Sequence, residues 1–413
     1  MERMQREFVI IHEKETAART INTRIDAIRT KDITKKGVRV YADGKIGISG
    51  GIGAVDEDGL VREAMENLSC GISYPYALSR DKKDHRDYLL DPLSSDDVVA
   101  IAESVLDTLR REHPAFDFSQ TIAFREVRQR IYNTAGLDLE YRDGHFAIEL
   151  LVKEKKSANV IDGILVCTSR KFDAEAFWSF ADSYLQAHLT PASFPEGEVL
   201  PVFTLEMDTL LGFLNRSLHG ERFATGSSLF SGRLGEQLFH EKITLEQSYN
   251  PHYTLRPFFD AEGVVLPEDR YVLIDQGRLV SVFTDKKTAA LYNLPHTGAA
   301  SGAYDEMPSL RSVPLHFRTD TSDLKAALNG QLALLVVLSS GGEFTPDGSF
   351  AAPVQLGFLF DGERLLGRLP ECTIRSHLFK MLGSDYIGTF DNTALYVGDV
   401  PTQLQGYYMQ VIR

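Results

Sequence analysis

Histidines, carboxylates and cysteines are the side chains of this chain that could hold a metal ion, and their spacing does not suit one. A zinc hydrolase needs three side-chain ligands, an open coordination position and a carboxylate that takes a proton from the metal-bound water. A helix can supply two ligands about one turn apart, but none of the 11 histidines pairs in this way. The nearest approaches, His219-Gly-Glu221 and His240-Glu241, do not place two ligands on one helical face. We expect ordinary surface or core histidines, with a non-standard metal site as the less favoured alternative.

A second candidate for chemistry is the segment 47–51, Gly-Ile-Ser-Gly-Gly, which matches the nucleophile elbow of some hydrolases. In a true elbow the serine lies at a strand-to-helix turn, and an acid and a histidine follow. Here the next helix signal comes only near Asp56–Asp58. We therefore favour a structural role for Ser49 over a nucleophilic one.

The stretch from Phe203 to Gln237 resembles the core of the TldD/PmbA family, the modulators of DNA gyrase, whose active members are metallopeptidases. In those members a helix with His-Glu-x-x-x-His runs into a Ser-x-Phe-Ser-Gly-x-x-Gly-Glu loop, which is intact here as 228–236. Counting back without gaps, the metal-site positions of the family fall on Leu211, Gly212 and Arg216. Leucine and glycine offer no side-chain ligand, and an arginine repels the metal ion. The cysteine that serves as third ligand in the family also has no counterpart, because Cys372 lies in a strand-like segment.

The resemblance extends along most of the chain. The segment 37–50 is similar to the amino-terminal strand pair of the family, and 258–263 (Phe-Phe-Asp-Ala-Glu-Gly) resembles its FDDEG-type turn. Active relatives have the serine loop beside the metal cleft, so the resemblance implies a cleft or interface role here, with an internal turn as the alternative. The residues concerned are Ser228, Ser231, Gly232, Gly235, Glu236, Asp260, Glu262 and Gly263.

Composition limits the class of protein. The formal net charge is −14, from 44 basic and 58 acidic residues, which argues against a protein that binds nucleic acid by neutralising phosphates. Hydrophobic residues at 43% and charged residues at 25% are ordinary for a globular protein. No segment resembles a signal peptide or a membrane span. The three widely separated cysteines fit reduced thiols and a cytoplasmic location.

Sequence patterns predict alternating strands and helices in the first half of the chain. Strands are expected at Phe8–Ile11 and Val38–Ile48, the latter interrupted by an Asp-Gly hairpin turn at 42–45. A helix should begin after Ser94/Ser95 and end before Pro114, and another should cover Asp173–Leu189. Between them, 121–168 should form three strands joined by turns at 133–136 and 142–144.

The proline-rich segment 191–197 is the best linker, which divides the chain into an amino-terminal α/β domain, 1–190, and a β-rich carboxy-terminal domain, 198–413. One helix, Met207–Leu218, is expected just after the linker. The predicted fold class is α+β, of the TldD/PmbA type.

The leading hypothesis from the resemblance is a non-catalytic, PmbA/TldE-like subunit. Such a subunit would pair with a TldD-type chain that carries the zinc, bind no cofactor itself, and help to bind and process peptides. The chain would then be inactive alone. The alternatives are a self-associating, homodimeric peptide-binding protein without peptidase activity and, least favoured, an independent hydrolase.

Overall fold

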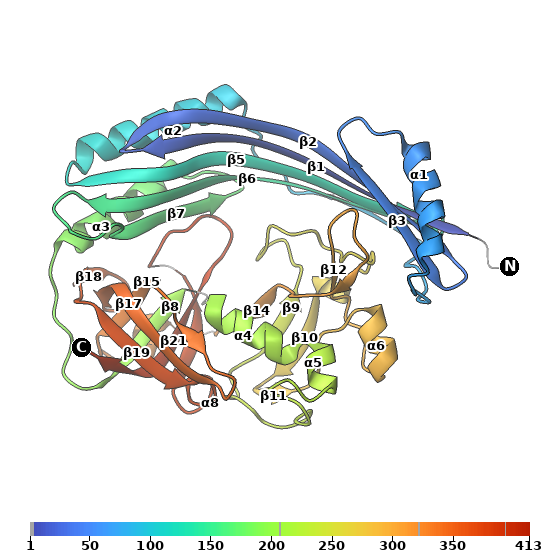
Figure 1. Cartoon of the computed structure of the whole chain (residues 1–413). Coiled ribbons are helices and arrows are strands. Elements are labelled where there is room, and N and C mark those ends of the chain that lie inside the picture. Colours follow the sequence, from blue (N-terminus) through green and yellow to red (C-terminus); the bar gives the residue numbers. More distant parts are fainter. Residues whose placement is uncertain (1–3, 206–207, 321–322, 393) are drawn as a thin grey trace.

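An arched sheet, antiparallel except for the parallel pairing of β4 with β6, forms the first half of the molecule (Figure 1). The computed structural model describes residues 4–205, 208–320, 323–392 and 394–413. The strand order is β3-β2-β1-β5-β6-β4, with β7 also paired to β6. The strands are β1 (Gln5–Ile21), β2 (Arg24–Ala42), β3 (Lys45–Ile52), β4 (Lys82–Asp87), β5 (Phe116–Asn133), β6 (Leu137–Glu154) and β7 (Gly163–Ser169).

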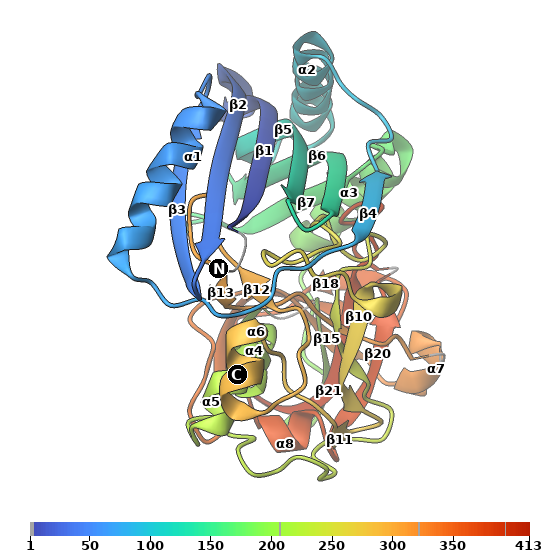
Figure 2. The ribbon, with the colours of Figure 1, turned by 90° about the vertical axis from the view of Figure 1, so that its right-hand side faces the viewer.

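Helices cover the outer side of this arch and leave its inner side to face the second half (Figures 1 and 2). Helix α1 (Glu57–Glu66) packs on β2 and β3, and the short helix η1 (Asn67–Cys70) follows it. Helix α2 (Ser95–Glu112) packs on β1, β2 and β5, and α3 (Ala174–Leu189) lies between the two halves. The Ser94 side chain caps α2 in a capping box with Asp97, as the Ser/Asp pattern predicts.

The second half is built around a ring of five strands that closes on itself. The order β15-β8-β21-β19-β17 is completed by pairing of β17 with β15, so these strands have no free edge within the ring. The ring strands are β8 (Val199–Leu205), β15 (Ala333–Ser339), β17 (Ser349–Phe360), β19 (Cys372–His377) and β21 (Gln403–Ile412). Attached to them are β16 (Glu343–Phe344), β18 (Leu365–Arg368) and β20 (Tyr386–Asp391).

A small sheet of order β11-β10-β9-β14 stands beside the ring (Figure 1). Its strands are β9 (Leu245–Ser248), β10 (Arg270–Asp275), β11 (Arg278–Leu279) and β14 (Leu315–Phe317), and β12 (Ala300–Ser301) pairs separately with β13 (Ser309–Leu310). The helices of this half are α4 (Asp208–Leu218), α5 (Gly220–Ala224), η2 (Pro267–Asp269), α6 (Lys286–Tyr292), α7 (Leu324–Leu328) and α8 (Leu378–Met381).

Most of the expected elements are confirmed, and one turn is wrong. The hairpin at 42–45, the helices after Ser94 and Asp173, and the β5–β6 turn at 133–136 are present. The predicted turn at 142–144 does not exist, because β6 runs straight through it. Asp143 is buried there and accepts a hydrogen bond of 2.6 Å from Arg170, so the Asp-Gly pair serves tertiary packing instead of a turn. The third strand begins only at Gly163.

The expected linker 191–197 connects α3 to β8. The domain boundary at this linker stays a prediction, because the hydrophobic core runs across it. The ring of Tyr184 in α3 lies 5.4 Å from that of Phe358 in β17, measured between centroids. Met207, the expected start of the next helix, lies outside the described residues, and α4 begins at Asp208.

Candidate functional site

Helix α4 carries the three positions where the family motif would place its metal site. Phe213 and Leu214 anchor the helix in the core, and Leu211 packs partly buried against the same cluster. Gly212 is exposed, and a Cβ atom added to it would meet no described atom within 4 Å. Arg216 is also exposed, with its guanidinium carbon 5.6 Å from the centre of the Phe213 ring. The helix therefore keeps an open outer face without any metal-binding side chain at these positions.

The remaining donor residues do not compensate for this loss. Within the part of the chain that the structure describes, no group of three histidine, cysteine, aspartate or glutamate side chains is placed to hold a metal ion. Cys372 lies in β19, where burial raises the pKa of its thiol to about 11 and keeps it protonated. Burial lowers the pKa of His219, just after α4. These residues do not fit a zinc site. That the chain binds no zinc of its own stays a prediction.

The serine loop, residues 224–236, is held against the end of α4 by its own side chains. Ser228 Oγ donates to the carbonyl of Ser217, and it also accepts from the backbone N–H of Phe230 at 3.0 Å. Ser231 Oγ donates to the carbonyl of Phe223 at 2.9 Å. The predicted site serines are thus structural donors that fix the loop.

The rest of the serine loop presents backbone to solvent. Gly232 and Gly235 have φ of 77° and 87°, conformations that favour glycine, and no described atom lies within 4 Å of a Cβ built on either. Glu236 pairs with Arg233 at 2.9 Å on the surface, and Arg233 lies over the ring of Phe379. The loop is an ordered, exposed surface that a second molecule could approach closely.

The other predicted group, Asp260, Glu262 and Gly263, lies elsewhere, at the junction between the arch and the second half. The Asp260 carboxylate accepts backbone N–H bonds from Glu262 at 2.9 Å, Val264 at 2.8 Å and Ala300 at 3.0 Å. Burial, with the nearby Glu262 charge, nevertheless raises the pKa of Asp260. Asp260 therefore shapes the turn and has no free oxygen directed to a substrate.

Glu262 binds side chains from both halves of the molecule. Tyr74 Oη donates to it at 2.6 Å, the backbone N–H of Lys286 donates at 3.1 Å, and His296 Nε2 lies 3.6 Å away. Burial disfavours its charged form, but the contacts with His296, Lys286 and Tyr74 outweigh this and lower the pKa of Glu262. The carboxylate stays ionised and ties the segment before β4 to the start of α6.

A buried ion pair completes this junction. Arg39 and Glu7 lie 3.1 Å apart, each side chain 1% exposed, on neighbouring strands of the arch. Arg39 Nη1 also donates to the carbonyl of Ala261 at 2.7 Å. Gly263, with φ of 68°, is so close to the arch that an added Cβ would lie 2.4 Å from Leu137 Cδ2. The junction is a tightly packed contact that contains a buried ion pair.

The serine loop and the junction turn therefore occupy different surroundings in one fold. Comparison with known proteins relates this fold to a family. Residues 204–400 match the family model of the PmbA/TldA metallopeptidase C-terminal domain. This segment is a domain of the TldD/PmbA family. Its α4, serine loop and junction turn all lie within the matched segment.

Solved structures share this TldD/PmbA-type fold over nearly the whole chain. TldE from Thermococcus kodakarensis has 18% identity and a TM-score of 0.76, and the match covers 99% of this chain and 97% of that one. A candidate DNA gyrase modulator from Thermotoga maritima gives 18% identity and a TM-score of 0.76, with 99% and 96% covered. An uncharacterised protein of Methanocaldococcus jannaschii is 24% identical over 357 residues, 83% of this chain and 81% of its own. The predicted α+β class is confirmed.

Ser49 joins β3 to α1 through a hydrogen bond. It lies inside β3, in the hairpin partner of β2, and its Oγ donates to the carbonyl of Leu60 in α1 at 2.6 Å. The strand continues to Ile52, so the serine is not at a strand-to-helix turn. The preference for a structural serine is confirmed.

Sequence reasoning missed the charged inner face of the arch. Glu13 and Glu15 share a side of β1 with Val9, which packs on Phe258 and Phe259 of the second half. Glu13 pairs with Lys31 and with Lys35, while Glu15 pairs with Arg125 at 2.9 Å. A cavity of about 270 Å³ opens there, lined also by Val127 and by His145, whose pKa burial lowers. The alternation of charged residues in β1 was the available signal.

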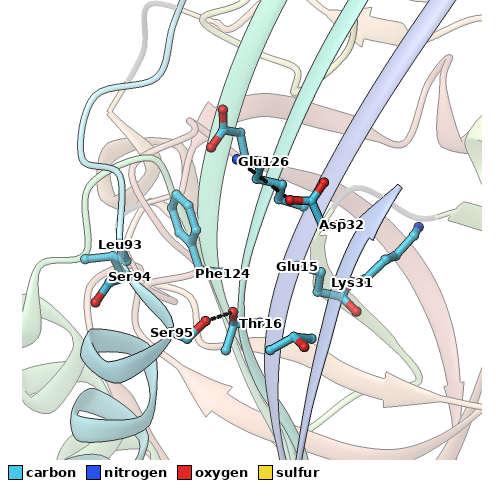
Figure 3. A pocket seen from close by; sticks show the side chains of 11 residues that line it. Glu15, Thr16, Lys31, Asp32, Leu93, Ser94, Ser95, Phe124 and Glu126 are labelled. Atoms are coloured by element: carbon cyan, nitrogen blue, oxygen red, sulfur yellow. Dashed lines mark hydrogen bonds and ion pairs between the residues drawn. The ribbon is translucent and has the colours of Figure 1, made fainter. Parts of the chain in front are cut away.

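A further pocket, of about 400 Å³, lies where the first turn of α2 meets β1, β2 and β5 (Figure 3). Thr16 Oγ1 and Ser95 Oγ are 2.8 Å apart across its floor. Glu15, Lys31, Asp32 and Glu126 project around it, so charges of both signs line the pocket. Charges of both signs do not indicate one class of ligand.

Proposed function

We propose that this chain is a non-catalytic, PmbA/TldE-like subunit that pairs with a TldD-type zinc metallopeptidase to bind and process peptides. The observation that supports this most strongly is the outer face of α4, where Gly212 and Arg216 stand exposed in place of metal ligands. The serine loop beside it keeps its internal hydrogen bonds despite that loss. A chain that keeps the fold and the serine loop but has no metal-binding side chains on α4 suits a subunit whose role is assembly. Zinc is then expected on the partner only.

The exposed serine loop is the proposed contact with the partner. Its glycines place bare backbone on the surface, which permits close approach of another chain. Leu234, between Gly232 and Gly235, is 52% exposed, an apolar side chain on an otherwise open loop. An apolar residue flanked by a surface ion pair is a usual composition for a protein interface.

The arch is the proposed peptide-binding wall. Its inner face carries balanced ion pairs, so it attracts neither acidic nor basic peptides selectively. At the end of the strand order, β3 leaves Ile52 61% exposed, and an extended peptide could add to this edge through backbone hydrogen bonds. Low sequence specificity is the expected consequence. No helix within the described residues is long and apolar enough to cross a membrane.

The test is production of the chain alone and together with a chain that carries His-Glu-x-x-x-His. Alone, it should contain far less than one equivalent of zinc and cleave no peptide. In the mixture we expect a complex and chelator-sensitive peptidase activity. Leu234→Asp should prevent the complex, whereas Leu291→Asp, at a leucine on α6 with similar exposure, should not (52% and 62% exposed).

Two outcomes would decide for the alternatives. Peptidase activity of the chain alone, abolished by a chelator, would make it an independent enzyme. A stable dimer of this chain that binds peptide and ignores every zinc-bearing partner would make it a self-associating binding protein, since symmetric homodimers are common. A cytoplasmic location, which the three free thiols suit, is part of the proposal.

A further inference from the structure

The small sheet β9–β10–β14 has one face in the core and one face at a pocket. Leu245 and Leu315 point into the hydrophobic cluster that also contains α4. The neighbouring residues Glu246 and His316, directly opposite each other in the strand register, point to the other side. There a pocket of about 450 Å³ opens. The sheet separates this pocket from α4 and the serine loop.

A buried carboxylate forms the floor of the pocket. The Glu246 side chain is 5% exposed, and its Oε1 accepts a hydrogen bond from Arg318 Nη2 and lies 3.7 Å from Arg270 Nη1. Its other oxygen, Oε2, accepts no hydrogen bond from the described residues. This oxygen is therefore open to a hydrogen-bond donor that enters the pocket.

An aromatic pair completes the floor of the pocket beside Glu246. Tyr253 stacks on His316 with ring centroids 3.9 Å apart and planes 19° from parallel. Burial lowers the pKa of His316 to about 4, with a smaller effect of Arg318, so the imidazole is neutral near pH 7. A neutral imidazole has one nitrogen that can accept a hydrogen bond. The floor of the pocket is thus rich in acceptors.

The rim of the pocket is rich in hydrogen-bond donors. Arg270 and Arg318 are 42% and 53% exposed. Each guanidinium has five N–H donors and uses few of them here, Arg270 toward Glu268 and Arg318 toward Glu246. The remaining donors of both arginines are free to take a carboxylate in a two-point contact.

We propose that this pocket binds the zwitterionic head of a free α-amino acid. The ammonium would donate to Glu246 Oε2 and His316 in the floor, and the carboxylate would accept from Arg270 and Arg318 at the rim. The pocket contributes two glutamates and two arginines, so a zwitterion enters without adding net charge. Its volume suits a molecule of this size. The site needs no partner subunit, so its test is independent of the proposed pairing.

The experiment is calorimetric titration of the full chain with L-phenylalanine, whose ring can extend along the exposed edge of Tyr253. N-acetyl-L-phenylalanine lacks the ammonium, and L-phenylalaninamide lacks the carboxylate. We expect the amino acid to bind and each derivative to bind at least about tenfold more weakly. Equal binding of the three compounds, tighter binding of either derivative, or no binding of the amino acid would overturn the proposal. This comparison uses the unaltered protein and does not depend on any variant folding.

A matched pair of variants then locates the site. Arg318→Gln removes a rim guanidinium that is 53% exposed, and Arg311→Gln removes one that is 52% exposed and bound to a single glutamate elsewhere. Affinity for L-phenylalanine should fall at least about tenfold in the first variant and stay unchanged in the second. Unchanged affinity in Arg318→Gln, with the fold verified by its thermal transition, would place any observed binding outside this pocket.

Discussion

The serine loop and the junction turn resemble the same family, yet they differ in every physical respect that decides a role. The loop is exposed, its glycines have open space around them, and its Arg233–Glu236 pair lies in solvent. The turn is buried, its glycine touches the arch, and it adjoins the Arg39–Glu7 pair, of which only 1% is exposed. Agreement with a family motif therefore does not separate residues that maintain the fold from residues that contact another molecule. The burial of each residue separates these two groups.

The comparison has an energetic consequence. A surface ion pair is screened by water and contributes little to stability, whereas a buried charge that loses its partner destabilises the fold strongly. Substitutions at the junction should therefore lower the free energy of unfolding. Substitutions at the surface ion pair of the serine loop should leave the free energy of unfolding nearly unchanged.

The largest expected effect is that of Glu7→Ala. It leaves the buried Arg39 guanidinium with the Ala261 carbonyl as its main acceptor, which should lower the free energy of unfolding by about 3–5 kcal/mol. Glu236→Ala is the control, because it removes one partner of a surface pair and should cost less than about 1 kcal/mol. Chemical denaturation measures both. Equal costs would remove the distinction between the two regions.

Two glycines with similar backbone conformation give the next test. Gly263→Ala adds a Cβ 2.4 Å from Leu137 Cδ2 at φ of 68°, so backbone strain and overpacking together should cost about 2–4 kcal/mol. Gly232→Ala, at φ of 77° with open space around the new methyl group, should cost only the backbone strain, roughly 1–2 kcal/mol. The difference between the two unfolding free energies isolates the contact with the arch. No difference would mean that the turn can move away from Leu137.

Features that depend on residues close together in the chain could be predicted from the sequence. Features that depend on contacts between distant residues could not. Ser94 and Asp173 cap helices through hydrogen bonds to residues three positions on, and both were predictable. The turn expected at 142–144 was wrong because Asp143 is bound by Arg170, a contact that no local pattern encodes.

The candidate site residues also fall into these two groups. The absence of metal-binding side chains at Leu211, Gly212 and Arg216 could be read from the sequence, because residue type alone decides it. The burial of Glu262 could not, because its partner Tyr74 lies 188 residues away along the chain. The pocket at Glu246 was equally hidden, since His316 joins it from a different strand.

A third test uses the acid dependence of the junction. The pKa of Glu262 is lowered in the folded protein, so its contribution to stability is present above the unfolded value, near 4.5, and is lost as pH falls through the lower folded value. Glu262→Gln should cost about 1–3 kcal/mol at pH 7, through weaker hydrogen bonds to Tyr74 and Lys286. The gap between wild type and variant should narrow progressively below about pH 4.5. A gap that stays constant with pH would show that the carboxylate charge has no role at this junction.

The smallest effect is expected at Gly212, on the open face of α4. Glycine in a helix interior is less favourable than alanine by up to about 1 kcal/mol, and the added methyl group meets no described atom here. Gly212→Ala should therefore raise the free energy of unfolding slightly, in contrast to both other glycine substitutions, and thermal unfolding should show a small upward shift. Because the proposed contact with a partner is the serine loop, the variant should also still form the complex with a zinc-bearing chain. A variant that is more stable alone but unable to pair would move the interface onto α4, and would mean that bare backbone at the former metal position is what the partner recognises.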